Sequence, residues 1–136
     1  MMWSLMVFLF LATPSPTLPP EQQMAILAEA NTAFEKALAQ PDATQANGYY
    51  QQAIVAYERL LAAGVQNGKL YYNLGNAYFH RNDLGRAIAA YRQGIRLEPG
   101  NARLQANLQY TCQLRVDQFD RSARHALPEI LLFWHA

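Results

Sequence analysis

The chain lacks the clustered reactive residues that most enzymes and metalloproteins need. It has a single cysteine, Cys112, among 136 residues, so neither an intrachain disulfide nor a cysteine metal cluster is expected. Its three histidines, His80, His125 and His135, lack the i, i+4 spacing typical of metal ligands on a helix. The glycines are scattered and form no phosphate-binding loop. The sequence therefore predicts no catalytic residues, no metal site, no cofactor and no enzyme activity.

The chain also lacks a strong net charge, which is only +1 at pH 7. Proteins that bind nucleic acid through its phosphates carry a marked basic excess, so no nucleic-acid partner is expected. Most of the basic residues nevertheless lie from Lys69 onward. A weakly acidic partner or an anionic lipid surface would suit this asymmetry, although such charges are more often a solvated helix face.

No apolar run near the N-terminus is long enough to span a membrane comfortably. Residues 1–20 contain an apolar run from Met6 to Ala12, extended at the front by residues 1–5 and followed by a stretch rich in Pro, Ser and Thr. This organisation resembles a secretory signal peptide, and a short uncleaved anchor is the alternative. An apolar first helix of a soluble protein is a third interpretation. We expect an exported, periplasmic protein or one at the periplasmic face of the inner membrane.

The C-terminal residues 119–136 form a tail in which the helical pattern fades. Residues 127–134 are apolar apart from Glu129, and eight residues are too few to span a bilayer. The tail is interpreted as an interfacial segment, a docking strip or the start of a membrane span that continues past residue 136. Membrane association through the termini is therefore expected.

Residues 68–101 carry the most informative pattern in the chain. Tyr71, Leu74, Gly75 and Tyr78 recur at steps of three and four and share one face of a helix. After a break at residues 82–83, where Asp83 supplies an N-cap, a second apolar stripe follows. Its residues are Leu84, Ala87, Ile88, Tyr91 and Ile95. Pro99 ends that helix, so the unit is a helical hairpin with one apolar seam.

This hairpin resembles the tetratricopeptide repeat (TPR), in which an aromatic-x2-Leu-Gly-x2-Tyr pattern opens a repeat of 34 residues. Ala53, Ile54, Ala56 and Tyr57 precede Ala87, Ile88, Ala90 and Tyr91 by the same period. The resemblance implies an all-α array of stacked helical hairpins, about two repeats plus a capping helix. TPR arrays are protein-interaction scaffolds.

The flanking segments complete the expected array. Residues 21–67 form a degenerate first repeat that carries an insertion or a lengthened first helix, with a break or an added turn over residues 41–47. Residues 102–118 form a helix that caps the last seam, or the first half of a third repeat. Cys112 lies in its apolar pattern and is expected to be a small buried residue.

The chain resembles the periplasmic TPR proteins of bacterial aerotolerance (Bat) operons. The resemblance rests on the signal-like N-terminus and on three sequence motifs, A-N-x-A-F, GYYQQAIVAYERLL and LYYNLGNAYF. That resemblance implies a membrane-associated partner complex, with von Willebrand factor A-type membrane proteins and a chaperone-like ATPase. Family members continue into membrane-spanning segments, which this sequence does not show.

A binding surface is expected on the face of the hairpin beside the seam, where it would line the concave groove of the array. Six residues fall within about a 120° stripe at roughly 100° per residue: Lys69, Tyr72, Asn73, Asn76, Phe79 and His80. A shift of one repeat adds Arg103 and Asn107. Asparagine amides bind peptide backbone as donor and acceptor, and the aromatic rings supply apolar contact. The alternative is a set of ordinary solvated groove residues, and His80 with Arg81 and Asp83 is also interpreted as the polar end of a helix.

Some TPR domains hold a partner's C-terminal carboxylate with Lys, Arg and Asn at these places. The residues that match parts of such a clamp are Lys69, Asn73, Asn76, Arg103 and Asn107. Ala28 and Thr32 occupy the first repeat where Lys and Asn are needed, so a full clamp is not expected. We therefore expect a non-catalytic scaffold that binds a protein or peptide, with self-association through the repeat ends and the apolar tail as the alternative.

Overall fold

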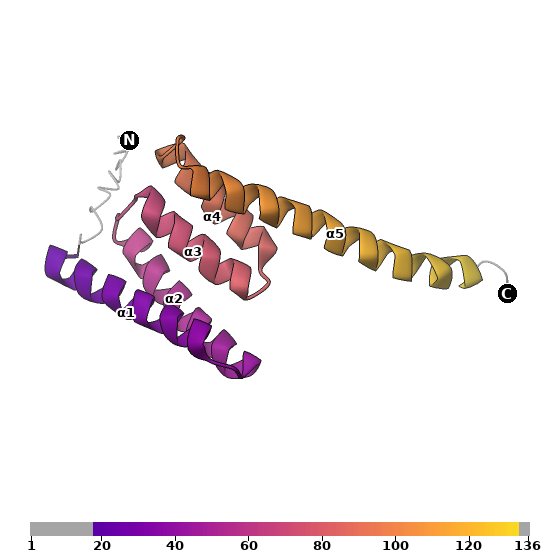
Figure 1. Ribbon diagram of the computed structural model, residues 1–136, viewed down its shortest axis with the longest axis horizontal. Helices are drawn as coiled ribbons and strands as arrows, with labels where there is room; N and C mark the ends of the chain where they lie inside the picture. The colour runs from indigo at the N-terminus through magenta and orange to yellow at the C-terminus, as the bar shows by residue number, and fades with distance from the viewer. Residues whose placement is uncertain (1–17, 134–136) are drawn as a thin grey trace, which may run out of the picture.

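The computed structural model describes residues 18–133, and the side chains of residues 18–121. These residues form α1 (Pro20–Ala39), α2 (Ala43–Ala62), α3 (Gly68–His80), α4 (Leu84–Leu97) and α5 (Ala102–Phe133). Each helix packs against the next: α1 with α2 and α3 with α4 form two hairpins, and α5 packs on α4 (Figure 1). The predicted all-α array of helical hairpins is confirmed.

Helices α2 to α5 start where polar side chains cap their first turns, whereas α1 begins at Pro20 without a side-chain cap. The Asp42 side chain accepts a 2.7 Å hydrogen bond from the Gln45 backbone at the start of α2. Asn67, Asp83 and Asn101 do the same for α3, α4 and α5. These bonds satisfy backbone N–H groups that have no partner within the helix. The predicted cap at Asp83 is confirmed.

Close approach between the helices depends on two glycines, Gly75 and Gly94. A Cβ atom on Gly75 would lie 2.4 Å from the Tyr91 ring, and one on Gly94 would lie 2.8 Å from the Leu104 side chain. Leu74 and Tyr78 are buried in the core, as the seam pattern predicted. The glycines therefore allow α4 to lie against α3 on one side and α5 on the other.

The first hairpin is longer than the second because both of its helices are extended. Helices α1 and α2 have 20 residues each, whereas α3 has 13 and α4 has 14. The expected break over residues 41–47 is wrong in extent, since residues 43–47 are the first residues of α2. The Asp42 cap starts the helix early, and no proline follows to interrupt it.

Helix α5 passes the expected end of the capping helix at residue 118 and continues to Phe133. The end of the tail, residues 134–136, lies outside the described residues, as do residues 1–17, on which most of the signal-peptide prediction falls. None of the helices in the described part of the chain has an apolar stretch long enough to cross a bilayer.

Candidate functional site

Two clefts flank α3, one between α3 and α5 and one between α1 and α3. The cleft between α3 and α5 has a volume of about 320 Å³, and we call it the α3–α5 cleft. It is lined by Tyr72, Asn76, Phe79, His80, Tyr91, Asn107, Tyr110 and Thr111. A smaller cleft of about 140 Å³, the α1–α3 cleft, is lined by Asn31, Phe34, Glu35, Tyr57 and Asn73.

Hydrogen bonds fix two asparagines in the wall of the α3–α5 cleft. The Tyr91 hydroxyl donates to Oδ1 of Asn76 at 2.8 Å, and Nδ2 of Asn107 donates to the same oxygen at 2.9 Å. A carbonyl oxygen has two lone pairs, so this acceptor is fully used inside the protein. Among the described residues, the amide N–H groups of Asn76 and the Oδ1 of Asn107 make no such bond and remain for a ligand. With its Oδ1 occupied in this way, Asn76 presents only N–H donors to the cleft.

The buried tyrosine ring holds this arrangement in one protonation state. Tyr91 is 1% exposed, and burial raises the pKa of its hydroxyl well above the ordinary value of 10. The hydroxyl is therefore a permanent donor at neutral pH. Thr111 adds rigidity beneath the cleft, because its hydroxyl donates to the Asn107 carbonyl oxygen at 2.6 Å.

The α1–α3 cleft repeats the same chemistry. The Tyr57 hydroxyl donates to Oδ1 of Asn31 at 2.8 Å, and Asn73 lines the cleft beside them. Tyr57 and Asn73 precede Tyr91 and Asn107 by 34 residues, the length of one repeat. The array therefore contains the same set of one tyrosine and two asparagines twice. The first set is Tyr57, Asn31 and Asn73, and the second is Tyr91, Asn76 and Asn107.

An aromatic row crosses both hairpins along these clefts. Its rings are those of Tyr50, Phe34, His80, Phe79 and Tyr110, from α2, α1, α3 and α5. His80 stacks on Tyr50 with ring centroids 5.1 Å apart, and burial lowers its pKa. His80 is the exposed last residue of α3, as the interpretation of His80, Arg81 and Asp83 as a polar helix end predicted. Its ring also packs against the aromatic rings of this row.

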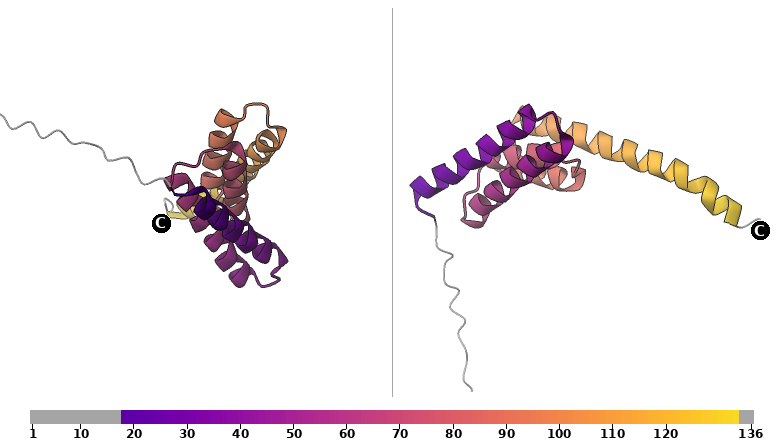
Figure 2. Two further views of the ribbon diagram at one scale, coloured as in Figure 1. Left: turned by 90° about the vertical axis from the view of Figure 1, so that its left-hand side faces the viewer. Right: turned by 90° about the horizontal axis from the view of Figure 1, so that it is seen from below.

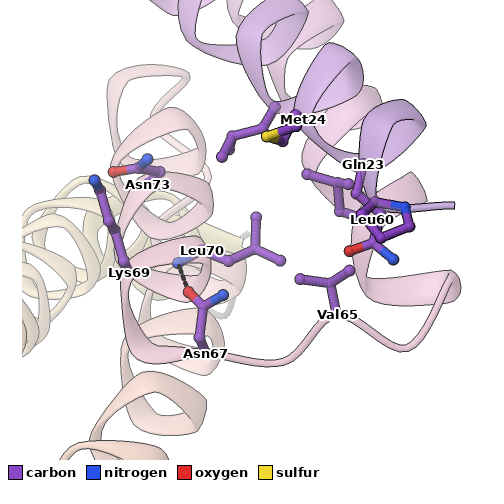
Figure 3. Close-up of a pocket in the computed structure, with 10 residues that line it drawn as sticks. Gln23, Met24, Leu60, Val65, Asn67, Lys69, Leu70 and Asn73 are labelled. Atoms are coloured by element: carbon purple, nitrogen blue, oxygen red, sulfur yellow. Dashed lines mark hydrogen bonds between the residues drawn. The ribbon is translucent and has the colours of Figure 1, made fainter. Parts of the chain in front are cut away.

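A separate apolar pocket of about 250 Å³ lies between the start of α1, the end of α2 and the start of α3 (Figure 3). Figure 3 shows Leu70 directed from α3 toward Leu60 and Met24. Met24 is 65% exposed at its edge. Lys69 and Asn73 also line this pocket, which we call the Met24 pocket.

The eight predicted groove residues therefore do not share one cleft. Five line the α3–α5 cleft: Tyr72, Asn76, Phe79, His80 and Asn107. Lys69 and Asn73 line the Met24 pocket, and Arg103 is exposed at the start of α5 and lines none of these three cavities.

Sequence reasoning missed Tyr91 and Tyr57 as site residues because it assigned the second helix of each hairpin to the seam. Their rings do lie in the core, but each hydroxyl reaches an asparagine of the preceding helix. A tyrosine at the same position of successive repeats is the signal that could have revealed this, since a buried hydroxyl needs a partner.

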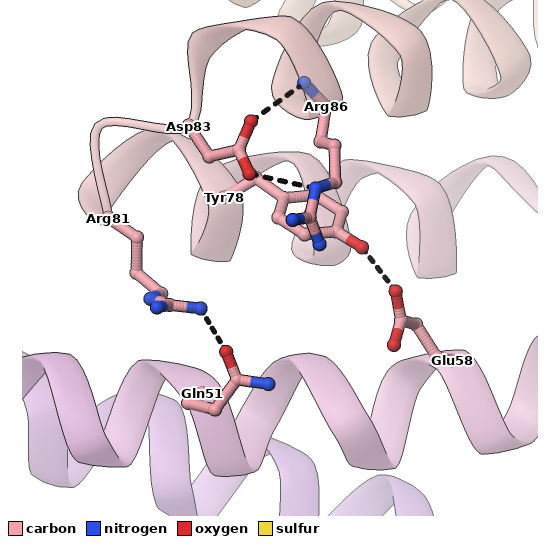
Figure 4. A network of polar contacts seen from close by, with 6 residues as sticks. All are labelled: Gln51, Glu58, Tyr78, Arg81, Asp83 and Arg86. Atoms are coloured by element: carbon pink, nitrogen blue, oxygen red, sulfur yellow. Dashed lines mark hydrogen bonds and ion pairs between the residues drawn. The ribbon is translucent and has the colours of Figure 1, made fainter.

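A polar network joins the two hairpins (Figure 4). The Tyr78 hydroxyl donates to Glu58, and Arg81 donates to Gln51. Burial, with a smaller contribution from the Glu58 hydrogen bond, raises the pKa of Tyr78 to about 12. Arg86 forms an ion pair with Asp83 at 2.8 Å. The Tyr78 and Arg81 contacts thereby link the end of α3 to α2.

The side chains described here include no group of three or more His, Cys, Asp or Glu residues that converge as metal ligands.

In comparisons with known proteins, residues 68–101 match the family model of the tetratricopeptide repeat. This match covers α3, α4 and the turn into α5. It supports the interpretation of the chain as a TPR protein. TPR repeats are commonly protein-interaction scaffolds. No curated protein matches the sequence.

Proposed function

We propose that this TPR-containing chain is a non-catalytic scaffold that binds an extended segment of a partner protein along the α3–α5 cleft. The observation that carries the proposal is the fixed pair Asn76 and Asn107. Internal hydrogen bonds orient both amides, while donors on Asn76 and an acceptor on Asn107 are left for a ligand. A peptide group offers the complementary acceptor and donor. Because the amides are already ordered, binding costs little side-chain entropy.

The rings beside these amides supply the apolar part of the contact. Tyr72 and Phe79 are half-buried in the wall of the cleft, and Tyr110 is 58% exposed at its rim. Aromatic side chains of this kind contribute most to many protein interfaces, because they bury a large area and have few rotamers. The preferred segment therefore carries apolar side chains beside an accessible backbone.

A long segment would contact the second copy of this arrangement at Asn31, Tyr57 and Asn73 and then reach the Met24 pocket. Lys69 is the cation at that pocket, so an acidic group at that end of the segment would be favoured. Aligning Asn31 with Asn76 places Met24 and Ala28 of α1 opposite Lys69 and Asn73 of α3. The first-repeat positions that correspond to the clamp Lys and Asn are therefore Met24 and Ala28, rather than Ala28 and Thr32 as expected from the sequence. Neither Met24 nor Ala28 can bind a carboxylate, so the clamp remains incomplete.

Partner capture from solubilised membranes tests the proposal. Tyr72→Ala combined with Asn107→Ala removes one ring and the ligand acceptor and should reduce recovery of a specific partner by about tenfold or more. The matched control is Gln52→Ala with Val55→Ala, two exposed positions of α2 outside the three cavities. Thermal unfolding of both variants checks that the fold is retained. Equal recovery with the cleft variant would rule out binding in this cleft.

We further propose that the protein acts at the periplasmic face of a bacterial membrane, in a complex with von Willebrand factor A-type membrane proteins. The signal-like residues 1–20 and the resemblance to aerotolerance TPR proteins support this proposal. A reporter enzyme that is active only after export, fused after residue 136, should be active. If a reporter enzyme that is active only in the cytoplasm is instead active when fused at the same position, the proposed periplasmic location would be contradicted.

A further inference from the structure

Helix α5 is long enough to extend well beyond the two hairpins. It has 32 residues, whereas α4 has 14, and its C-terminal half projects away from the other helices (Figure 1, Figure 2). Two large apolar residues are conspicuous where it leaves α4: Val116 is 66% exposed and Phe119 is 77% exposed. Isolated exposed apolar residues are ordinary, so the spacing of these two decides whether they form a surface.

The apolar positions of this part of α5 follow a heptad repeat. Cys112, Val116 and Phe119 are separated by four and three residues, and the sequence continues the same alternation at positions 123, 126, 130 and 133. Those four positions are Ala, Ala, Ile and Phe. Alternating steps of three and four define the a and d positions of a coiled coil. In this register Val116 is an a residue, while Cys112 and Phe119 are d residues.

The charges beside this stripe distinguish between helix orientations. Arg115 falls at position g and Asp120 at position e of the next heptad. In a parallel two-stranded coiled coil, a g residue lies beside the e residue five places later on the other helix, which pairs Arg115 with Asp120 twice by symmetry. An antiparallel pairing over the same heptads would place Asp120 beside Asp120 of the second copy. The charge pattern therefore favours a parallel pair.

The start of the stripe lies in an open groove between α4 and α5. The groove has a volume of about 710 Å³, and Ile88 and Arg92 of α4 line it together with Cys112, Val116 and Phe119 of α5. A second α5 entering this groove would contact α4 as well as α5. We propose that the chain forms a parallel homodimer, in which the α5 stripe of one copy packs against that of a second copy along this groove. This interface is separate from the α3–α5 cleft and does not depend on the proposed partner binding.

Cys112 supplies a direct test of the parallel register. Residues at d of a parallel pair face their own copies, which suits the separation of about 4.4–6.8 Å between Cα atoms that a disulfide needs. Mild copper-catalysed oxidation of the full chain should therefore yield a covalent dimer. In the matched control, Cys112→Ser with Arg121→Cys, the thiol stands at an f position on the opposite side of α5 and should give little covalent dimer. Absence of the Cys112 cross-link, or equal cross-linking from position 121, would overturn the proposal.

Sedimentation equilibrium of the full chain in mild detergent tests the interface without oxidation. Val116→Glu with Phe119→Glu places four carboxylates in the core of the pair and should leave only monomer at concentrations where the unaltered chain is dimeric. Val55→Glu, at an exposed apolar site of α2, is the matched control and should remain dimeric. Arg115→Asp should weaken dimerisation by about tenfold, and adding Asp120→Arg should restore it. A dimer that persists in the Val116 and Phe119 variant, or a chain that is monomeric throughout, would refute the interface.

Discussion

The hydroxyl of Tyr91 reaches from the core of the second hairpin to Oδ1 of Asn76, 2.8 Å away, at the wall of the α3–α5 cleft. Tyr91 thereby contributes both to the packing of the core and to the proposed binding surface. Its ring lies where a Cβ atom on Gly75 would clash, and its hydroxyl orients the amide that we expect to meet a peptide. Tyr57 and Asn31 repeat this relationship one hairpin earlier.

Removing the two hydroxyl groups separately tests whether the bonds stabilise the fold. Tyr91→Phe keeps the ring but leaves Asn76 with one internal donor, so we expect the free energy of unfolding to fall by about 1 kcal/mol. Tyr57→Phe should have a similar effect, because its hydroxyl makes an equivalent bond. Urea unfolding of both variants measures the change. A Tyr91→Phe variant as stable as the unaltered protein would show that the bond contributes nothing.

Glycine substitutions should have opposite signs at two positions. Gly75→Ala places a methyl group 2.4 Å from the Tyr91 ring, and such overpacking costs about 1–3 kcal/mol. Gly48 lies within α2 with no atom within 4 Å of its would-be Cβ, so Gly48→Ala should stabilise by up to about 1 kcal/mol through helix propensity. The shift in urea midpoint decides between the signs. A destabilised Gly48→Ala variant together with a stable Gly75→Ala variant would contradict the packing described here.

The hairpin seam was predictable from the sequence because helical periodicity alone places Leu74, Gly75 and Tyr78 on one face. The same periodicity placed Tyr72 and Asn76 together beside it. The structure confirms the burial of the first group and finds the second group in one cleft. Local geometry was sufficient because all five residues belong to α3.

What the sequence did not predict depends on contacts between helices. The stacking of His80 on Tyr50 joins α3 to α2, two elements whose relative position no local pattern encodes. The length of α2 was misjudged because it depends on the Asp42 cap rather than on apolar periodicity. The direction of the Asn76 amide is set by Tyr91 and Asn107, one on each neighbouring helix. Such features require the packed structure.

His80 should make stability depend on pH near neutrality. Burial lowers its pKa from the ordinary value of 6.5, so the unfolded chain binds a proton more readily than the folded one. This contribution to stability is complete above pH 6.5 and decreases as the pH falls toward the folded-state pKa. Urea unfolding between about pH 8 and pH 5.5 should show the decrease. His80→Phe, which retains a ring for Phe34 and Tyr50, should reduce the slope, and an identical slope in that variant would exclude His80 as its source.

The buried tyrosines should give a second pH dependence, with the opposite sign, in alkali. Burial raises the pKa values of Tyr57 and Tyr78 from 10.0 to about 12, so the neutral phenols stabilise the fold. Their contribution is complete below pH 10 and is lost as the pH rises toward 12. Ultraviolet titration of phenolate should therefore show a late phase that coincides with loss of helix by circular dichroism. Because the Tyr78 hydroxyl donates to the Glu58 carboxylate, Glu58→Gln should shift part of that late phase to lower pH. Ionisation of every tyrosine in one early phase, with the helices intact, would contradict the buried positions of these rings.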